Sequence, residues 1–232
     1  MSLNLLLDQA RKTDNRGKKS KWYMPAGEER QEASALYRFA IRVALQIHGS
    51  ESLEVAKVIK EAARHFEERH CENGRPENSR WNKCAAIPEN QESVEARQNY
   101  QEALAIYKAN NIRYSTELAD IYMSLAKLVK PNGESQVSQL DLMNQAIDTL
   151  EFCLGFDHPE TGESYARMGL ACQEAGNYKG ASLGLRRAFC VFFKSLGPND
   201  SVTLGVHQQM VQVDENLDRT DISHLPYQEQ PQ

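Results

Sequence analysis

The chain has 232 residues, of which 41% are hydrophobic and 25% charged, and its net charge at neutral pH is −5. This composition is typical of a folded protein rather than a disordered one. No apolar run approaches the roughly eighteen residues that a membrane span needs, and the acidic balance argues against nucleic acid as a partner of the folded body.

The first 29 residues are expected to form a basic, mobile arm. The apolar start at Leu3–Leu7 is too short for a secretory signal, and no small-residue cleavage site follows it. Residues 11–21 carry six Lys and Arg against a single Asp, and Pro25 interrupts any helical pattern. The run Lys18–Lys21 precedes two aromatic residues, so it could contact nucleic acid, a membrane surface or an import receptor. A solvated terminal arm is the simpler interpretation.

Helical periodicity begins at Arg30 and continues for most of the chain. It predicts eight helices, at about residues 30–47, 52–70, 93–109, 115–130, 137–153, 159–175, 178–195 and 201–217. Residues 71–92 contain Gly74, Pro76 and Pro88, and we expect a loop insertion there. Residues 218–232 contain two further prolines and are expected to form a disordered tail. The repeat domain therefore spans residues 30–217, and no segment alternates as a strand would.

Small residues recur at fixed places in these helices. Four anchor positions hold alanine, namely Ala40, Ala103, Ala146 and Ala188. Sixteen residues after each anchor stands a second small or apolar residue, namely Ala56, Ala119, Gly162 and Leu204. Small side chains let neighbouring helix backbones approach closely, and no single helix pair can cover its own apolar face. The register predicts an all-α fold, an α-solenoid of stacked antiparallel helix pairs.

The residues that suggest a protein family lie in the unit Gly162–Ser195. They are Tyr165, Met168, Gly169, Cys172, Gly176, Tyr178, Ala181, Leu185 and Ala188. This order of aromatic, small and glycine positions resembles the tetratricopeptide repeat. The linker Leu154–Pro159 recurs 42 residues later as Leu196–Ser201, a period that resembles the kinesin-light-chain class of this repeat. The closing stretch is also similar to the end of the tetratricopeptide repeat protein 23 family.

The resemblance covers about residues 30–217. It implies a superhelix of three complete repeats with flanking half-units. The first predicted helix has no convincing partner before it, because the preceding segment is polar and contains Pro25.

The five cysteines are odd in number and contain no Cys-x-x-Cys motif. We interpret them as reduced thiols of an intracellular, cytoplasmic protein, with Cys153, Cys172 and Cys190 buried at apolar helix positions. His70 and Cys71 with Cys84 could hold zinc, but the spacing is unusual and no fourth ligand is apparent. No metal or cofactor is therefore expected.

His158 lies between Asp157 and Glu160 and could be imagined as a general base. The recurrence of its linker favours a role in helix capping and turn geometry instead. No other residues suggest an active site, so the sequence predicts a protein without catalytic activity.

In this repeat class the first helices of the pairs line a concave groove. Counting from the anchors predicts that twelve residues face it, namely Lys57, Lys60, Arg64, Glu67, Asp120, Met123, Lys127, Lys130, Glu163, Ala166, Leu170 and Gln173. The candidate peptide-binding residues among them are Lys57, Lys60, Arg64, Met123, Lys127, Lys130, Ala166 and Leu170. Five cations followed by apolar residues would suit an extended peptide with acidic and apolar side chains. The alternative is that these are ordinary exposed charges.

The sequence thus predicts a protein–protein interaction adaptor or scaffold, with a protein or peptide partner and no small-molecule substrate. Two alternatives remain. The chain could be a structural scaffold that uses its edges and convex face, or a regulatory piece of a larger enzyme. The unpaired first helix is the motive for the second alternative.

Overall fold

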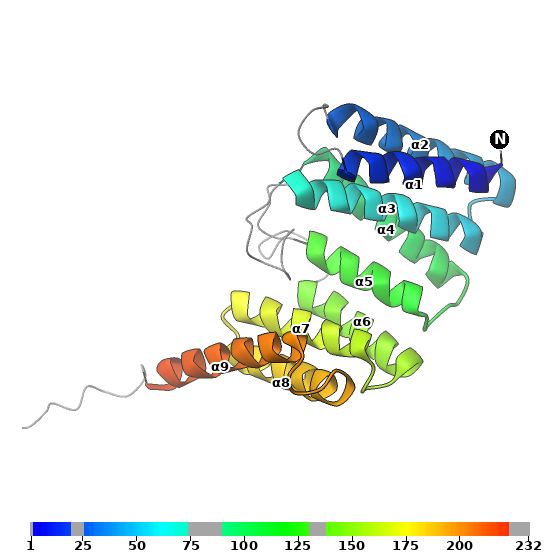
Figure 1. Ribbon diagram of the computed structural model, residues 1–232. Helices are drawn as coiled ribbons and strands as arrows, with labels where there is room; N and C mark the ends of the chain where they lie inside the picture. The colour runs from blue at the N-terminus through cyan, green and yellow to red at the C-terminus, as the bar shows by residue number, and fades with distance from the viewer. Residues whose placement is uncertain (1, 20–25, 74–89, 130–137, 223–232) are drawn as a thin grey trace, which may run out of the picture.

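The computed structural model describes residues 2–19, 26–73, 90–129 and 138–222, and within these ranges the chain consists of α-helices joined by turns (Figure 1). The helices are α1 (Leu3–Lys19), α2 (Ala26–His48), α3 (Leu53–Asn73), α4 (Gln91–Ala109), α5 (Thr116–Leu128), α6 (Gln139–Leu154), α7 (Pro159–Glu174), α8 (Tyr178–Ser195) and α9 (Ser201–Ile222). The predicted all-α class is confirmed. The described residues hold one helix more than predicted.

The additional helix is α1, which shows that the prediction of a mobile arm over residues 1–29 was wrong. Leu6, Leu7 and Ala10 are buried in the main core, with Leu6 only 1% exposed. The buried face of α1 continues with Thr13 and Asp14, which are polar but also buried. Sequence reasoning missed this helix because the basic residues around the stripe dominated its composition. Of the basic run, Lys18 and Lys19 close α1, and residues 20–25 lie outside the described ranges.

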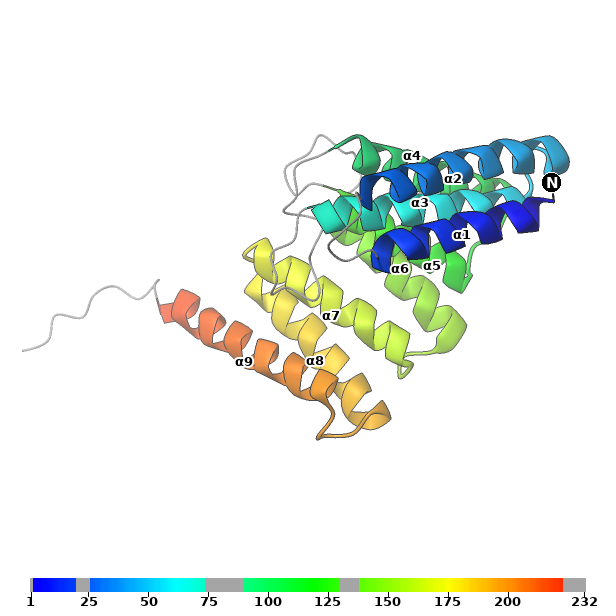
Figure 2. The ribbon, with the colours of Figure 1, turned by 45° about the horizontal axis from the view of Figure 1, so that its top comes forward.

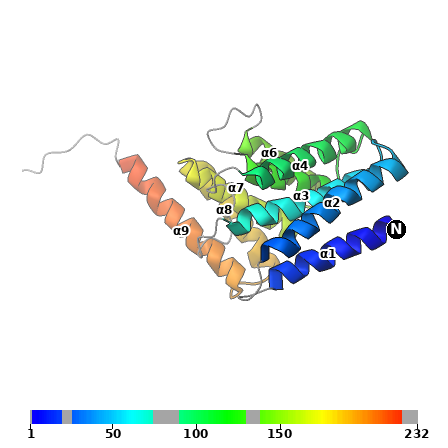
Figure 3. The ribbon, with the colours of Figure 1, turned by 90° about the horizontal axis from the view of Figure 1, so that it is seen from above.

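Each odd-numbered helix packs against the even-numbered helix that follows it, and α9 packs against α8. The odd-numbered helices α1, α3, α5 and α7 form one layer and the even-numbered helices the other (Figures 1 and 2). Because α1 pairs with α2, the prediction that the first helix of the repeat domain has no partner before it was also wrong. The described residues form four pairs with α9 as a capping helix, and Figure 3 shows how the direction of the helices changes between α1 and α9.

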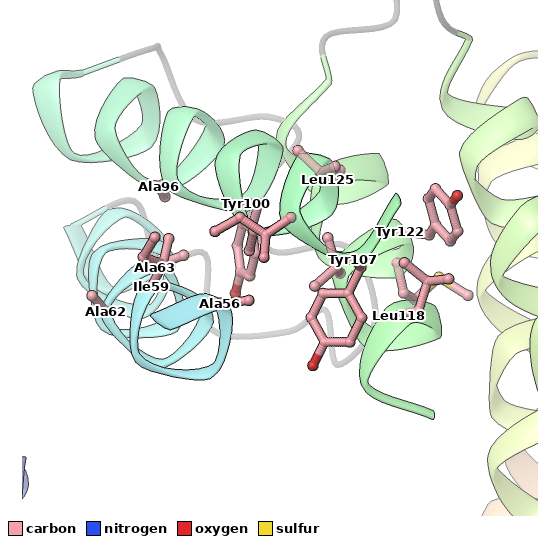
Figure 4. Packing of buried hydrophobic residues seen from close by; sticks show 14 of the residues in the cluster. Ala56, Ile59, Ala62, Ala63, Ala96, Tyr100, Tyr107, Leu118, Tyr122 and Leu125 are labelled. Carbon is pink, nitrogen blue, oxygen red and sulfur yellow. The ribbon is translucent and has the colours of Figure 1, made fainter. Parts of the chain in front are cut away.

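The small-residue register accounts for this packing. All four alanine anchors are 0% exposed, as the sequence predicted. Among the second anchors, Ala56 and Ala119 are buried at 0% and 1%, and Gly162 is buried as well. Figure 4 shows Ala56 and its neighbours on α3 lying against Ala96 and Tyr100 of α4. The exception is Leu204, which is 48% exposed because no helix of the described chain covers that side of α9.

The turn before α7 follows the predicted linker geometry. His158 is the N-cap residue of α7, with its Nδ1 accepting a hydrogen bond from the backbone N–H of Glu160 at 3.3 Å. Pro159 occupies the first turn, where its missing N–H costs nothing. Gly155 adopts a φ of 93°, a conformation that favours glycine. His158 therefore has a capping role.

Two predicted boundaries need correction. Helices α3 and α4 extend into the expected loop at both ends, reaching Asn73 and starting again at Gln91, while residues 74–89 lie outside the described ranges. Helix α9 continues to Ile222, so residues 218–222 are helical rather than a disordered tail. Residues 223–232 are not among those described. No described helix combines the length and hydropathy needed to cross a membrane.

The cysteine prediction was also partly wrong. Cys71 is disulfide-bonded, and its partner is none of Cys153, Cys172 and Cys190, which are free thiols. Counting cysteines could not reveal this, because it says nothing about which sulfurs the fold brings together. Only Cys172 of the three free thiols is buried, and that burial raises its pKa.

Candidate functional site

A hollow of about 900 Å³ runs across α1, α3, α5 and α7, and we call it the groove. Five of the predicted site residues line it, namely Lys57, Lys60, Arg64, Met123 and Lys127. Three do not belong to its described lining. Ala166 and Leu170 pack in the C-terminal hydrophobic cluster, and Lys130 lies outside the described residues.

Helix α7 lines the groove with a face that matches the predicted one only at Glu163. Its lining residues are Glu160, Glu163, Ser164 and Arg167. Counting from Gly162 assumed that every pair has the same orientation. The burial of Ala166 to 1% exposure shows that α7 is turned so that this position faces the core.

The groove is less cationic than the sequence suggested. Its lining contains eight Asp and Glu against six Lys and Arg, a formal charge of −2 with histidine neutral. Counting positions only at the expected spacing overlooked carboxylates beside them, such as Glu61, Glu117 and Glu160. An acidic ligand is thus not favoured by the overall charge of the groove.

Several cations of the groove already form ion pairs with carboxylates of neighbouring helices. Lys60 Nζ on α3 lies 3.3 Å from Asp120 Oδ2 on α5. Arg11 on α1 donates to both carboxylate oxygens of Glu61 on α3, at 2.6 and 2.7 Å. These pairs connect neighbouring odd-numbered helices, and they would compete with any acidic ligand for the same cations.

Lys127 belongs to a buried network around Glu67. Its Nζ donates to Glu67 Oε1 at 2.9 Å, and the Tyr100 hydroxyl donates to Glu67 Oε2 at 2.7 Å. Glu67 is only 7% exposed. Burial, together with the charge of Glu67, raises the pKa of Tyr100 well above its usual value. Lys127 therefore stabilises a buried carboxylate, a role the sequence did not reveal.

Arg64 is the exposed cation of the groove for which the described residues provide no ion-pair partner. Lys57 pairs only with Glu54, one turn away on the same exposed face of α3, at 3.0 Å. Such a pair is weak because both groups are solvated. Arg64 and Lys57 are therefore the groove cations that a ligand can reach most easily.

Three polar side chains link α1, α2 and α3 beside the groove. Asp14 Oδ1 lies 3.0 Å from His65 Nδ1, an ion-pair distance without the direction of a good hydrogen bond. His65 Nε2 lies 3.0 Å from Ser34 Oγ, and Arg69 donates to the same oxygen at 2.5 Å. Sequence reasoning missed these residues, although Asp14 falls four positions after Ala10 on the buried stripe of α1.

The order carboxylate, imidazole and hydroxyl is that of a hydrolytic triad, but the environment does not suit one. Ser34 is 2% exposed and His65 is 3% exposed, so a substrate carbonyl cannot reach the hydroxyl. Arg69 also occupies the oxygen that would attack. The arrangement instead holds α1 against α3.

The suggested zinc ligands are otherwise engaged where the structure describes them. Cys71 is in a disulfide, and His70 Nδ1 lies 3.0 Å from Asn90 Oδ1. Cys84 lies outside the described residues. Within the described ranges, no three His, Cys, Asp or Glu side chains gather as a metal site.

Comparison with known proteins gives a match in structure but not in sequence. No family model and no curated protein matches the chain. The TPR-like repeats of a Podosopora anserina protein called a kinesin light chain superpose with a TM-score of 0.69 at 16% identity, over 94% of this chain and 89% of that chain. The fold is a tetratricopeptide-like repeat solenoid.

Two further structures agree. A single-substitution variant of the same Podosopora anserina repeats gives a TM-score of 0.69 at 15% identity, over 94% of this solenoid and 90% of the other chain. BtubC (BKLC) from P. vanneervenii gives 0.55 at 14% identity, over 100% of this solenoid and 96% of that chain. The resemblance inferred from the repeat pattern is confirmed for the fold, and at such identities it says nothing about a specific partner.

Proposed function

We propose that this solenoid is a non-catalytic interaction scaffold that holds an extended segment of a partner protein in its groove. The observation that carries the proposal is the hollow along four successive odd-numbered helices. A repeat array offers such a surface on rigid helices, and a peptide that lies along it contacts several repeats at once.

The charge of the expected segment follows from the groove. Lys60 and Lys127 already contact Asp120 and Glu67, so a purely acidic segment would have to displace these carboxylates. Carboxylates dominate the lining contributed by α7, where Arg167 pairs with Glu163 of the same helix at 2.5 Å. We therefore propose a segment of mixed charge, with an acidic side chain near Arg64 and basic side chains near α5 and α7.

The test must avoid the buried network. Reversing Lys60 and Lys127 together would remove the partner of buried Glu67, so loss of binding could reflect unfolding. Arg64→Glu with Lys57→Glu changes only exposed groove cations. Gln98→Glu with Gln101→Glu on α4 is the matched control, because both glutamines are exposed and outside the groove lining.

Peptides selected from a random library against the wild-type protein would be measured by fluorescence anisotropy. We expect the groove variant to weaken binding by about tenfold or more, and the control to change it by less than about twofold. Equal dissociation constants for the groove variant and the wild type would refute the groove proposal. If the selected peptides were uniformly acidic and their binding depended on Arg64, the ligand would be the acidic peptide expected from the sequence and not one of mixed charge.

A structural scaffold that uses the convex face is the second candidate. It is favoured by large apolar side chains exposed on even-numbered helices, including Phe39 at 45% and Phe152 at 69%. The regulatory-piece alternative depended on an unpaired first helix. Since α1 supplies that partner, no observation favours this alternative.

A further inference from the structure

We propose a second docking surface, separate from the groove, that binds a short partner segment containing a large apolar residue flanked by carboxylates. It is a hollow of about 380 Å³ between the α4–α5 turn and α6, which we call the outer hollow. Lys108, Arg113, Tyr114 and Asp148 are the lining residues that carry the argument.

An exposed aromatic pair stands beside this hollow. The Tyr114 ring stacks on the Phe152 ring of α6, with centroids 4.0 Å apart and planes inclined by 24°. The two residues are nevertheless 48% and 69% exposed. Covering exposed apolar surface is favourable, so a large apolar residue of a partner would bind on this aromatic pair.

The turn that presents Tyr114 is fixed before any ligand binds. Asn111 adopts a φ of 56°, and the Ile112 N–H donates to the Tyr107 carbonyl at 3.1 Å. Asn110 Nδ2 donates to the Glu51 carbonyl of the neighbouring turn at 2.8 Å. A preformed surface loses little conformational entropy on binding, which favours recognition of a short segment.

The charges of the outer hollow differ from those of the groove. Lys108 and Arg113 are exposed, and neither has an ion-pair partner among the described residues. Lys108 Nζ lies 6.0 Å from the centroid of the Tyr122 ring, over its face. Asp148 is the one carboxylate of the described lining, so cations are in excess. Carboxylates of a ligand therefore complement this surface without displacing internal partners, as they would in the groove.

The probe is a fluorescein-labelled peptide of twelve residues in which Phe and Leu alternate with Asp and Glu. We expect Lys108→Glu with Arg113→Glu to weaken its binding to the full chain by about tenfold or more. Phe152→Ser, which removes an exposed ring, should also weaken it. Circular dichroism would verify that both variants keep the helical content of the wild type, since the changed side chains are exposed.

The groove variant Arg64→Glu with Lys57→Glu is the control and should change binding of this probe by less than about twofold. A probe in which Asn and Gln replace Asp and Glu should bind more weakly to the wild type. The proposal is overturned if the wild type does not bind the acidic probe, or if the Lys108 and Arg113 variant binds it as tightly as the wild type. Loss of binding in the groove variant alone would also overturn it, because the acidic segment would then lie in the groove.

Discussion

Gly169 on α7 and Gly184 on α8 bring two helix backbones into direct contact. A Cβ atom on Gly184 would lie 3.0 Å from both the Cα and the N of Gly169, and 3.1 Å from the Tyr165 carbonyl oxygen. These neighbours are backbone atoms of a helix, so they cannot move aside as the end of a long side chain would. The close approach of α7 and α8 thus requires glycine at position 184.

Gly184→Ala should destabilise the protein even though alanine is the better helix former. The helix propensity gain is about 1 kcal/mol, while forced separation of packed helices typically costs about 1–3 kcal/mol or more. Gly205→Ala on α9 is the matched control, because an added Cβ there meets open space. Urea unfolding should give a lower stability for the first variant and an unchanged or higher one for the second. Equal effects would contradict the close-packing explanation.

Asp14→Ala should weaken the attachment of α1. It removes the group 3.0 Å from buried His65 Nδ1, and losing a partner of a buried polar group costs about 1–3 kcal/mol. Asp8→Ala on the same helix is the control, since Asp8 is exposed and pairs only with Arg11 one turn away. Hydrogen exchange should accelerate in α1 for Asp14→Ala alone. If both variants exchange alike, His65 does not hold α1 in place.

Lys127→Ala should destabilise the protein by about 1–3 kcal/mol, because buried Glu67 would lose its ion-pair partner and keep the hydrogen bond from the Tyr100 hydroxyl at 2.7 Å. Adding Glu67→Gln should recover part of the loss, because it removes the buried charge. Lys57→Ala, which affects an exposed pair, should change the stability by less than about 0.5 kcal/mol. Thermal or urea unfolding of the three variants would check this order, and a neutral effect of Lys127→Ala would contradict it.

Stability should fall in alkaline solution because several tyrosines are buried as neutral phenols. Burial, with a hydrogen bond to Glu151, raises the pKa of Tyr165 to about 12, and burial raises the pKa of Tyr37 and Tyr100. The unfolded chain releases its phenolic protons near pH 10 while the folded chain retains them. The stabilisation that these neutral tyrosines provide is therefore complete below about pH 10. It is lost as the pH rises towards their pKa values in the folded protein.

Urea unfolding at pH 8, 10 and 11.5 would measure this loss. The decline should be shallower in Tyr100→Phe, which has one fewer shifted group. A free energy of unfolding that stays constant from pH 8 to 11.5 would contradict the raised pKa values of these tyrosines.

The sequence predicted the stacked pairs because their register depends on local and countable residues. Alanine at positions 40, 103, 146 and 188 marks the contact between helices whatever the partner. The sequence did not predict α1, because the buried face of that helix includes the polar residue Asp14. The partner of Asp14 is His65, which is distant in the sequence. The candidate site was predicted only in part for a similar reason. Residue spacing locates Lys60 and Lys127 on the groove face, but only the fold reveals that Asp120 and Glu67 neutralise them.

Site-specific photo-crosslinking tests the central proposal most directly. A photoreactive amino acid would replace Arg64 in the groove or, as the control, Gln101 on the exposed side of α4. Crosslinked partners would be mapped by mass spectrometry. The groove proposal predicts that position 64 captures one short contiguous segment of a partner and that position 101 does not. Capture of the same partner only from position 101 would show that this solenoid does not bind its partner in the groove.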